Sequence, residues 1–256
     1  MGCSITNMVL NVLNSDMSLA CLNKTNIALI PKVNNPKKMF DFHPISLCNV
    51  VYKLISKIIA NRFKAILPHI ISENQSAFTA DRLITDNVLV AFELMHFLNH
   101  KNARIDGFMA AKLDMSKAFD RVEWGFIQGV MERLGFSSRW VNLVMKCITL
   151  VSYLVIINGT ACGNIMPTQG LRQGDPLSPI LFLICTERLL ALINEATQNQ
   201  VLTGISICRG CPRVTHLLFV DDSIIFYKAS ARNMRMLRVR RSILISPQFS
   251  LAPVLL

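Results

Sequence analysis

Two adjacent acids, Asp221 and Asp222, stand inside the apolar stretch "LLFVDDSIIF" of residues 217–226. Burying unpaired carboxylates is costly, so the fold has to expose these charges or neutralise them. Asp-Asp-Ser between two β-forming runs is typical of a tight turn, which would place both acids at a solvated hairpin tip. The alternative is a divalent cation held by the carboxylates. Taken alone, this stretch favours the turn, because Asp is a common turn residue.

A third acid, Asp114, ends the apolar run "FMAAKLD" of residues 108–114 in the same way. If the two runs are neighbouring strands of one sheet, the three carboxylates converge and repel one another unless cations neutralise them. Mg²⁺ is the natural cation, with Mn²⁺ as the alternative, because it takes hard oxygen ligands and shares its coordination shell with substrate phosphates. Two such ions about 4 Å apart suit in-line phosphoryl transfer.

A third element, "QGLRQGDPLSP" at residues 169–179, carries polar and glycine residues suited to a binding site. Gly170 and Gly174 allow a close backbone approach, and Gln173 supplies an amide that hydrogen-bonds in both directions. The plain structural reading is the start of a helix, with Pro176 near its first position. The two readings are compatible.

Length and composition limit the classes of protein to consider. With 256 residues, 52% of them hydrophobic, the chain can bury a sizeable core in one large domain or two small ones. The net charge of +11 indicates a polyanionic partner, either nucleic acid or an anionic membrane surface. No apolar run reaches the ~18 residues that a membrane span needs, so we expect no membrane association.

The cysteines and the N-terminus bear on location. Eight scattered cysteines favour free thiols in a reducing compartment, and we expect an intracellular protein of the nucleus or cytoplasm. Cys208 and Cys211 form a CxxC pair, for which a strand-connecting turn is favoured over zinc. The start "MGCSIT" fits an N-myristoylation pattern, which raises the hypothesis of a lipid-anchored protein. Such a short pattern arises easily by chance, so we expect no acylation.

The elements that must position these residues follow from periodicity and turn residues. Helices and hairpins alternate without a regular βαβ rhythm, which predicts an α+β fold with a mostly antiparallel sheet. The helix after residue 50 has a basic flank of Lys53, Lys57 and Arg62, which is either a solvated face or a nucleic-acid contact. The predicted strands begin near 27, 108 and 216, a hairpin turns at Asn158-Gly159, and helices cover about 51–67, 85–98, 123–134, 137–148 and 176–196.

The motifs, in their order and spacing, resemble the reverse transcriptase domain of non-LTR, LINE-type retrotransposons abundant in plant genomes. The resemblance covers roughly residues 20–231 and rests on "LIPK", "FHPISLCNVVYKLISKIIANR", "ENQSAF", "RLITDN", "KLDMSKAFDRVEW", "GLRQGDPLSP" and "HLLFVDD". It implies a right-hand polymerase with fingers at 20–105 and a palm at 106–231, without a thumb. Residues 1–19 are expected to be poorly defined, and the tail 232–256 departs from the family pattern.

The resemblance also implies roles for single residues in an RNA-directed DNA polymerase that joins a dNTP to a primer 3′-hydroxyl, with an RNA template and a DNA primer as partners. Asp114 and Asp221 are similar to the catalytic metal ligands, Asp222 supports them, and the carbonyl of Met115 completes a metal shell. Phe119 is similar to the steric gate that rejects a ribose 2′-hydroxyl, with a core aromatic as the alternative. The nucleotide and its triphosphate are assigned to Lys32, His43, Arg82, Gln173 and Gly174.

Two positions depart from the family pattern. His43 stands where the family has Arg, so a permanently charged fork is replaced by a ring that is mostly neutral near pH 7. Asp81 stands where the family has Gly, beside Arg82. Both changes predict weaker nucleotide binding. The alternative function is therefore an inactive retrotransposon remnant that binds nucleic acid through charge alone.

Overall fold

The chain divides into two compact units, each assembled from two separate stretches of sequence. Unit 1 comprises residues 1–66 and 119–184, and unit 2 comprises residues 67–118 and 185–256. The computed structural model describes residues 2–15, 17–79, 82–100, 107–114, 117–219 and 222–228, with the backbone alone at 2, 3, 84, 113 and 114. The predicted limits of fingers and palm are contiguous stretches, which this division does not test.

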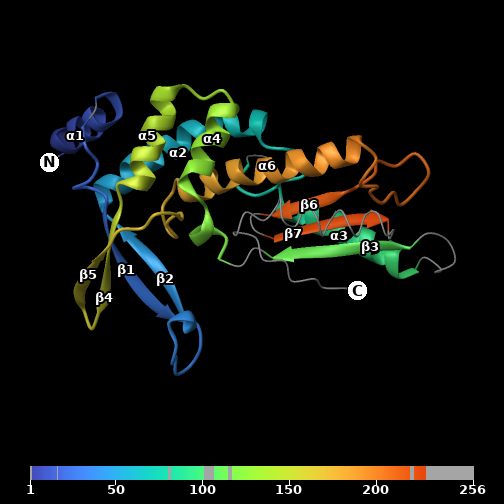
Figure 1. Ribbon diagram of the computed structural model, residues 1–256, viewed down its shortest axis with the longest axis horizontal. Helices are drawn as coiled ribbons and strands as arrows, with labels where there is room; N and C mark the ends of the chain where they lie inside the picture. The colour runs from blue at the N-terminus through green and yellow to red at the C-terminus, as the bar shows by residue number, and fades with distance from the viewer. Residues whose placement is uncertain are drawn as a thin grey trace. The chain divides into compact units, whose positions relative to one another are not determined.

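Unit 1 contains a four-stranded sheet in the order β2-β1-β4-β5 (Figure 1). Its strands are β1 (Lys24–Pro31), β2 (Phe42–Cys48), β4 (Ser152–Ile157) and β5 (Thr160–Ile165). All pairs are antiparallel except β1 with β4. Asn158 and Gly159 make the predicted hairpin turn, both with positive φ, as a two-residue turn of this kind requires. Strand β2 was missed because it contains Pro44, which an edge strand tolerates.

The helices of unit 1, except the first, begin and end close to the predicted positions. They are α1 (Gly2–Asn14), α4 (Trp124–Arg133), α5 (Ser138–Thr149) and the first parts of α2 (Val50–Ile70) and α6 (Ser178–Gln198), with short 3₁₀ turns η1 (Met39–Asp41) and η2 (Phe119–Arg121). Ser137 caps α5 through its hydroxyl, which accepts from Trp140 N, and Gly135 with φ +82° follows α4. Helix α1 differs from the expectation of a poorly defined N-terminal segment.

Unit 2 is built on a three-stranded antiparallel sheet in the order β3-β7-β6 (Figure 1). Its elements are α3 (Ile84–His100), β3 (Phe108–Asp114), β6 (His216–Phe219) and β7 (Asp222–Lys228). Leu94 of α3 packs with Leu217 and Phe226 of the sheet and with Ile205. This apolar cluster fixes one face of the sheet beneath α3.

Two further expectations from the sequence concern the cysteines and membrane-spanning helices. Cys208 and Cys211 are joined in a disulfide, which differs from the expected free thiols, while Cys48, Cys147 and Cys185 are free and buried. Among the described helices, none is both long and apolar enough to cross a bilayer.

Candidate active site

Strands β3 and β7 bring two of the predicted catalytic acids to one end of the unit 2 sheet. Their antiparallel register places Asp114 directly opposite Asp222. Alternation along β7 puts Asp222 on the same face as Ile224 and Phe226, which pack toward α3. That face is therefore apolar where α3 covers it and carries an exposed acid where the strand begins. Asp221 and Met115 lie outside the described residues.

A cation already neutralises the Asp222 carboxylate. Lys112 Nζ lies 3.0 Å from Asp222 Oδ1, and both side chains are about half exposed, at 52% and 58%. Lys112 stands two residues before Asp114 on β3, opposite Ile224. A hard carboxylate oxygen that holds an ammonium group at the exposed end of two strands suits a divalent ion. Among the described side chains, which include neither Asp221 nor the side chain of Asp114, no three or more His, Cys, Asp or Glu residues lie close enough to hold a metal ion.

Arg82, also in unit 2, is held by backbone carbonyls. Its Nη1 donates to Ser72 O at 2.6 Å and to Gln75 O at 2.8 Å, and its Nη2 donates to Ile71 O at 3.3 Å. These carbonyls follow the end of α2, where unpaired C=O groups need donors. Arg82 therefore has a structural role in this turn, and its predicted role toward a triphosphate stays a prediction. Asp81 lies outside the described residues.

In unit 1, the Gln173-Gly174 segment lies along the outer edge of β2. Ser46 N donates to Gln173 O at 3.0 Å, and a Cβ at Gly174 would meet Ser46 O at 3.2 Å. Gly174 also has a φ of +99°, a backbone conformation that residues with a side chain rarely adopt. The close backbone approach expected at this glycine is thus made to strand β2, and Gln173 is half-buried.

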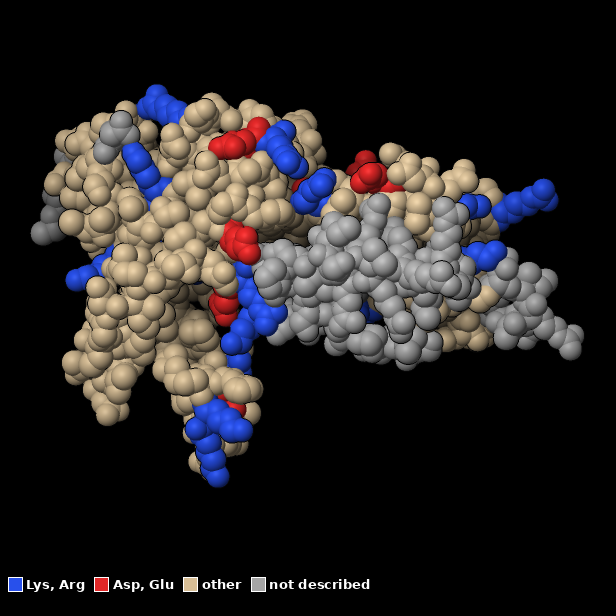
Figure 2. All heavy atoms as spheres, in the orientation of Figure 1, with Lys and Arg blue, Asp and Glu red and all other residues tan. Residues whose placement is uncertain are grey.

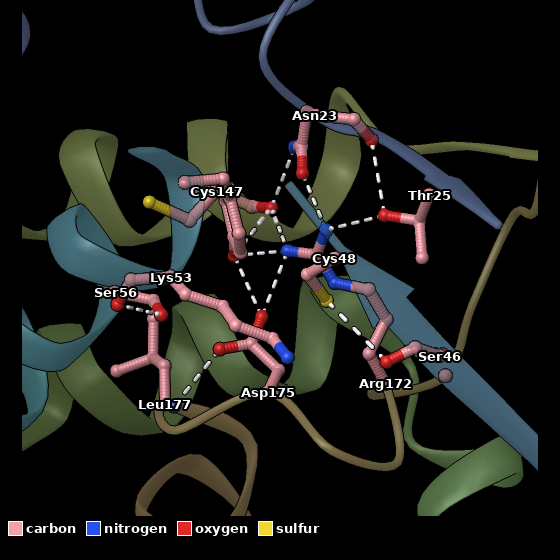
Figure 3. Close-up of polar contacts among 12 residues, drawn as sticks. Asn23, Thr25, Ser46, Cys48, Lys53, Ser56, Cys147, Arg172, Asp175 and Leu177 are labelled. Atoms are coloured by element: carbon pink, nitrogen blue, oxygen red, sulfur yellow. Dashed lines mark hydrogen bonds and ion pairs between the residues drawn. The ribbon is translucent and has the colours of Figure 1, made fainter. Parts of the chain in front are cut away.

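A buried polar network surrounds Arg172 and Asp175, the residues on either side of this segment (Figure 3). Arg172 is 4% exposed, and Asp175 is 3% exposed. Arg172 Nη2 lies 2.9 Å from Asp175 Oδ2 and donates to Cys147 O at 2.9 Å. The guanidinium also donates to Asn23 Oδ1 and to the Tyr52 hydroxyl, and its carbon lies 4.0 Å from the centre of the Tyr52 ring. The two charged residues flank Gln173 and Gly174 and hold both ends of the turn.

The surroundings of the network favour a charged Arg172 and a protonated Tyr52 hydroxyl. Burial, followed by the charge of Asp175, raises the pKa of the Tyr52 hydroxyl, which donates to Asp175 Oδ2 at 2.7 Å. Burial alone would lower the pKa of Arg172, but Tyr52 and Asp175 outweigh it and the pKa is raised. Asp175 Oδ1 accepts from Leu177 N at 3.0 Å just before α6 begins. The ion pair is therefore desolvated but surrounded by partners.

Phe119 lies next to the same segment. Leu171 N donates to Phe119 O at 2.8 Å, which ties η2 to the stretch before Arg172. The Phe119 ring stacks on the buried Phe182 of α6, with centroids 4.9 Å apart and planes 13° apart. The residue is half-buried, so one ring face is fixed by packing while part of the side chain remains accessible. A gate and a packed aromatic are both compatible with this geometry.

Lys32 and His43 lie at the tip of the β1–β2 hairpin, where Lys and Arg side chains gather (Figure 2). Lys32, Lys37 and Lys38 are exposed, and Lys32 Nζ donates to Phe40 O at 3.2 Å. Backbone hydrogen bonds from Lys37 and then Lys38 lower the pKa of Asp41, so this tip also holds one anion. His43 is exposed and pairs with Ile30 across the strands. The tip is a cationic surface of unit 1.

The sequence interpretation missed Arg172, Asp175, Tyr52 and Asn23. A signal was present, since "LRQGDPL" sets an Arg and an Asp three residues apart in an apolar context, where charges need partners. The partners themselves are distant in sequence, because Arg172 is separated by 149 residues from Asn23 and by 120 from Tyr52. Only the fold brings them together.

Sequence comparison identifies the family. Residues 30–253 match the family described as reverse transcriptase (RNA-dependent DNA polymerase). The chain is 30% identical over 212 residues to the transposon TX1 uncharacterized 149 kDa protein of Xenopus laevis, covering 82% of this chain and 15% of that protein. It is 27% identical over 197 residues to the Pol polyprotein of the type-2 retrotransposable element R2DM of Drosophila melanogaster, covering 77% and 17%.

A shorter plant relative is more similar in sequence. The uncharacterized mitochondrial protein AtMg01250 of Arabidopsis thaliana is 51% identical over 70 residues, which cover 27% of this chain and 57% of that protein. The chain thus spans less than two thirds of each of these relatives. The resemblance to retrotransposon reverse transcriptases is confirmed, while the assignment to a plant-type element stays a prediction.

Solved structures show the same fold at low sequence identity. Telomerase from Candida albicans, solved with a fragment of telomeric RNA, gives a TM-score of 0.59 at 13% identity, covering 92% of this chain and 43% of that chain. Apo telomerase from Candida tropicalis gives 0.53 at 14% identity, covering 87% and 47%. The expected α+β polymerase fold with a mostly antiparallel sheet is confirmed. The chain belongs to the reverse transcriptase (RNA-dependent DNA polymerase) family.

Proposed function

We propose that the chain is the polymerase domain of an RNA-directed DNA polymerase, which transfers a nucleotidyl group from a dNTP to a primer 3′-hydroxyl. The observation that carries the proposal is the register of β3 with β7, which sets Asp114 opposite Asp222 at the exposed end of the sheet. Family membership supports it. The primer 3′-hydroxyl loses its proton to solvent, its oxygen forms the new bond to the α-phosphorus, and the bond from that phosphorus to the departing pyrophosphate breaks.

The acids at the strand ends have the central role. The carboxylates of Asp114, Asp221 and Asp222 would hold two Mg²⁺ ions, with the Met115 carbonyl as a further ligand. When bound, the ions supply activation of the attacking oxygen and neutralisation of the phosphate charge. The Lys112 ammonium at Asp222 indicates that this position favours a positive charge. A metal ion bound by the Asp222 carboxylate would compete with Lys112 for it.

The unit 1 residues would select and hold the nucleotide. Gln173 and Gly174 are proposed to line its pocket, on a turn that the Arg172 network keeps rigid. Phe119 is proposed as the group that meets a ribose 2′-hydroxyl, since its ring is fixed by stacking on Phe182. Lys32 and His43 of unit 1 are proposed as cationic or hydrogen-bonding partners of the triphosphate, and so is Arg82 of unit 2.

A primer-extension assay tests this function. The unmodified protein, an RNA template annealed to a DNA primer, dNTPs and Mg²⁺ should give an extended primer. Asp114→Asn should lower the extension rate by roughly a thousandfold, the equivalent of the several kcal/mol that a metal ion contributes. Glu195→Gln, which changes an exposed acid of α6, is the matched control and should keep the rate. Phe119→Val should let ribonucleotides be incorporated.

The same assay separates the alternative of an inactive remnant. A remnant would retain the RNA–DNA duplex in a mobility-shift experiment and give no extension with either Mg²⁺ or Mn²⁺. Metal binding is read separately by Fe²⁺-dependent cleavage of the protein backbone, expected near residues 114 and 222. Absence of extension together with absence of that cleavage would refute the polymerase function.

A further inference from the structure

A second basic site lies in unit 1, in a pocket of about 700 Å³ between α1, α2 and α5. Its lining includes Arg62 of α2, Arg139 and Lys146 of α5, the ring of Trp140, and the amides of Asn14 and Asn142. None of these residues has a role in the proposed polymerase site. None of the described residues that line the pocket is acidic, and Asp16 lies outside the described residues.

The cations face the pocket because of helix periodicity. Arg139, Asn142 and Lys146 are spaced i, i+3 and i+7 on α5, so they share one face, while the buried Val144 and Cys147 belong to the opposite one. Arg139 is held in place by donating from Nη2 to Asn14 O at 3.2 Å, at the end of α1. The start of α5, capped by Ser137, adds the partial positive charge of a helix N-terminus.

An aromatic wall accompanies the charges. The Trp140 ring meets Phe63 of α2 edge-on, with centroids 5.3 Å apart, so its orientation is fixed by the core. Trp140 itself is half-buried. A groove that combines Arg and Lys with a fixed aromatic ring suits a single nucleic-acid strand, because phosphates bind the cations and a base can stack on the ring. Lys and Arg side chains show over this end of unit 1 (Figure 2).

We propose that this pocket binds a single-stranded RNA segment through its phosphodiester backbone, outside the polymerase site. Its volume is within the ~300 to 1,000 Å³ that binding pockets occupy, which is enough for part of a strand but not for a duplex. The excess of Lys and Arg over Asp and Glu in the chain, 27 against 16, favours such a polyanion. The basic flank of α2 thus contributes Arg62 to a binding site.

The test is a binding titration with a labelled RNA of about 12 nucleotides, a length within the ~4 to 16 nucleotides that one groove covers. No dNTP or metal is added, so the result does not depend on polymerase activity. The double variant Arg62→Ala/Lys146→Ala should weaken binding at least about tenfold. Its salt dependence, the slope of log K against log salt, should fall by about 1.4, since each lost single-strand phosphate contact removes ~0.7.

The double variant Lys64→Ala/Arg133→Ala is the matched control, because it removes the same charges from exposed positions outside the pocket. If both double variants weaken RNA binding equally, net charge alone explains it and the proposal is wrong. Circular dichroism and thermal unfolding verify that each variant is folded.

A measurement on the unmodified protein avoids dependence on variants. Acetylation of lysines, followed by mass spectrometry, should show Lys146 protected by the bound RNA and Lys64 unprotected. Equal protection of both lysines, or of neither, would contradict the proposal. Protection of Lys146 by inorganic phosphate alone, or by polyglutamate, to the same extent as by RNA would assign the pocket to small anions or acidic chains and overturn the strand-binding role.

Discussion

Two acid–cation pairs of nearly equal geometry have opposite surroundings. Arg172 Nη2 and Asp175 Oδ2 are 2.9 Å apart with side chains 3% and 2% exposed. Lys112 Nζ and Asp222 Oδ1 are 3.0 Å apart with side chains 52% and 58% exposed. The distances alone would suggest that the two pairs contribute equally to the stability of the fold. Burial makes the first pair a structural element and leaves the second available for exchange with other ions.

The reason is desolvation. Two charges removed from water cost several kcal/mol each, and their mutual attraction offsets this only when further hydrogen bonds complete the site. Arg172 and Asp175 have these partners in Tyr52, Asn23 and the Cys147 carbonyl. An exposed pair gains at most about 1 kcal/mol, since water and salt screen it. An exposed acid such as Asp222 can therefore bind a metal ion without lowering the stability of the fold.

The largest expected effect is the loss of stability in Arg172→Met. The variant leaves the Asp175 carboxylate buried without its cation, which should lower the free energy of unfolding by about 3 to 5 kcal/mol. Urea unfolding followed by circular dichroism measures it. Lys112→Met, the same change of charge at the exposed pair, is the control and should cost no more than about 1 kcal/mol. Equal losses would remove the distinction between the pairs.

Unit 2 also contains a buried polar residue, His216, whose protonation state depends on its burial. Its side chain is 1% exposed, and burial lowers its pKa to about 4. Asn74 Nδ2 can only donate, so His216 Nε2 accepts at 3.0 Å and Nδ1–H donates to Thr215 Oγ1 at 2.8 Å. The neutral ring is therefore the form that fits, and protonation at Nε2 removes a hydrogen bond.

The pH dependence follows from this pKa. The pKa of His216 in the folded protein is below the ordinary value of 6.5, so its contribution is complete above about pH 6.5 and is lost as the pH falls toward 4. We expect a loss on the order of 3 kcal/mol across that window. The difference between the stability curves of the unmodified protein and His216→Gln isolates it, since Glu187, whose pKa burial raises, is common to both. A difference that does not change with pH would show that the ring is not held neutral.

Gly170 tests how tightly the segment before Arg172 is held. Its φ is +94°, and a Cβ there would lie 2.9 Å from Asp120 O. Gly135 is the control, with φ +82° and open space around the same position. Gly135→Ala should cost about 1 to 2 kcal/mol from backbone strain alone, and Gly170→Ala about 1 to 3 kcal/mol more, because backbone atoms must shift. Thermal unfolding of the two variants gives the difference, and equal costs would mean that the segment can move away.

The contrast between the two pairs also explains what the sequence could predict. Local patterns placed β3 and α5 and the Asn158-Gly159 turn, because alternation, capping and turn chemistry are properties of neighbouring residues. The sequence led us to expect Asp114 beside the run that ends in Asp221, whereas β3 pairs with β7, which begins with Asp222, and β6 lies on the far side of β7. The roles assigned to the site residues stay predictions.

Long-range contacts could not be predicted in this way. The partners of Arg172 come from sequence positions more than a hundred residues away. The hydrogen bonds from the Arg82 guanidinium to the carbonyls of residues 71, 72 and 75 were not predicted either, and its role toward a phosphate stays a prediction. A sequence pattern gives the charge of such a residue, but only the fold determines which groups neutralise it.

The smallest expected effect is at the exposed pair itself. Asp222→Asn should change the free energy of unfolding by less than about 1 kcal/mol, and a double-mutant cycle with Lys112→Met should give a coupling energy in the same small range.

Metal binding gives a second readout for Asp222→Asn. Mg²⁺ at ten times its dissociation constant should stabilise the unmodified protein by about 1.4 kcal/mol, because only the folded state has the strand register that joins the acids. Asp222→Asn should lose most of this stabilisation while its stability without Mg²⁺ stays unchanged. A variant that keeps the full Mg²⁺ effect would show that Asp222 is no ligand, and a coupling energy above about 3 kcal/mol would place the Lys112 pair in the same class as the buried one.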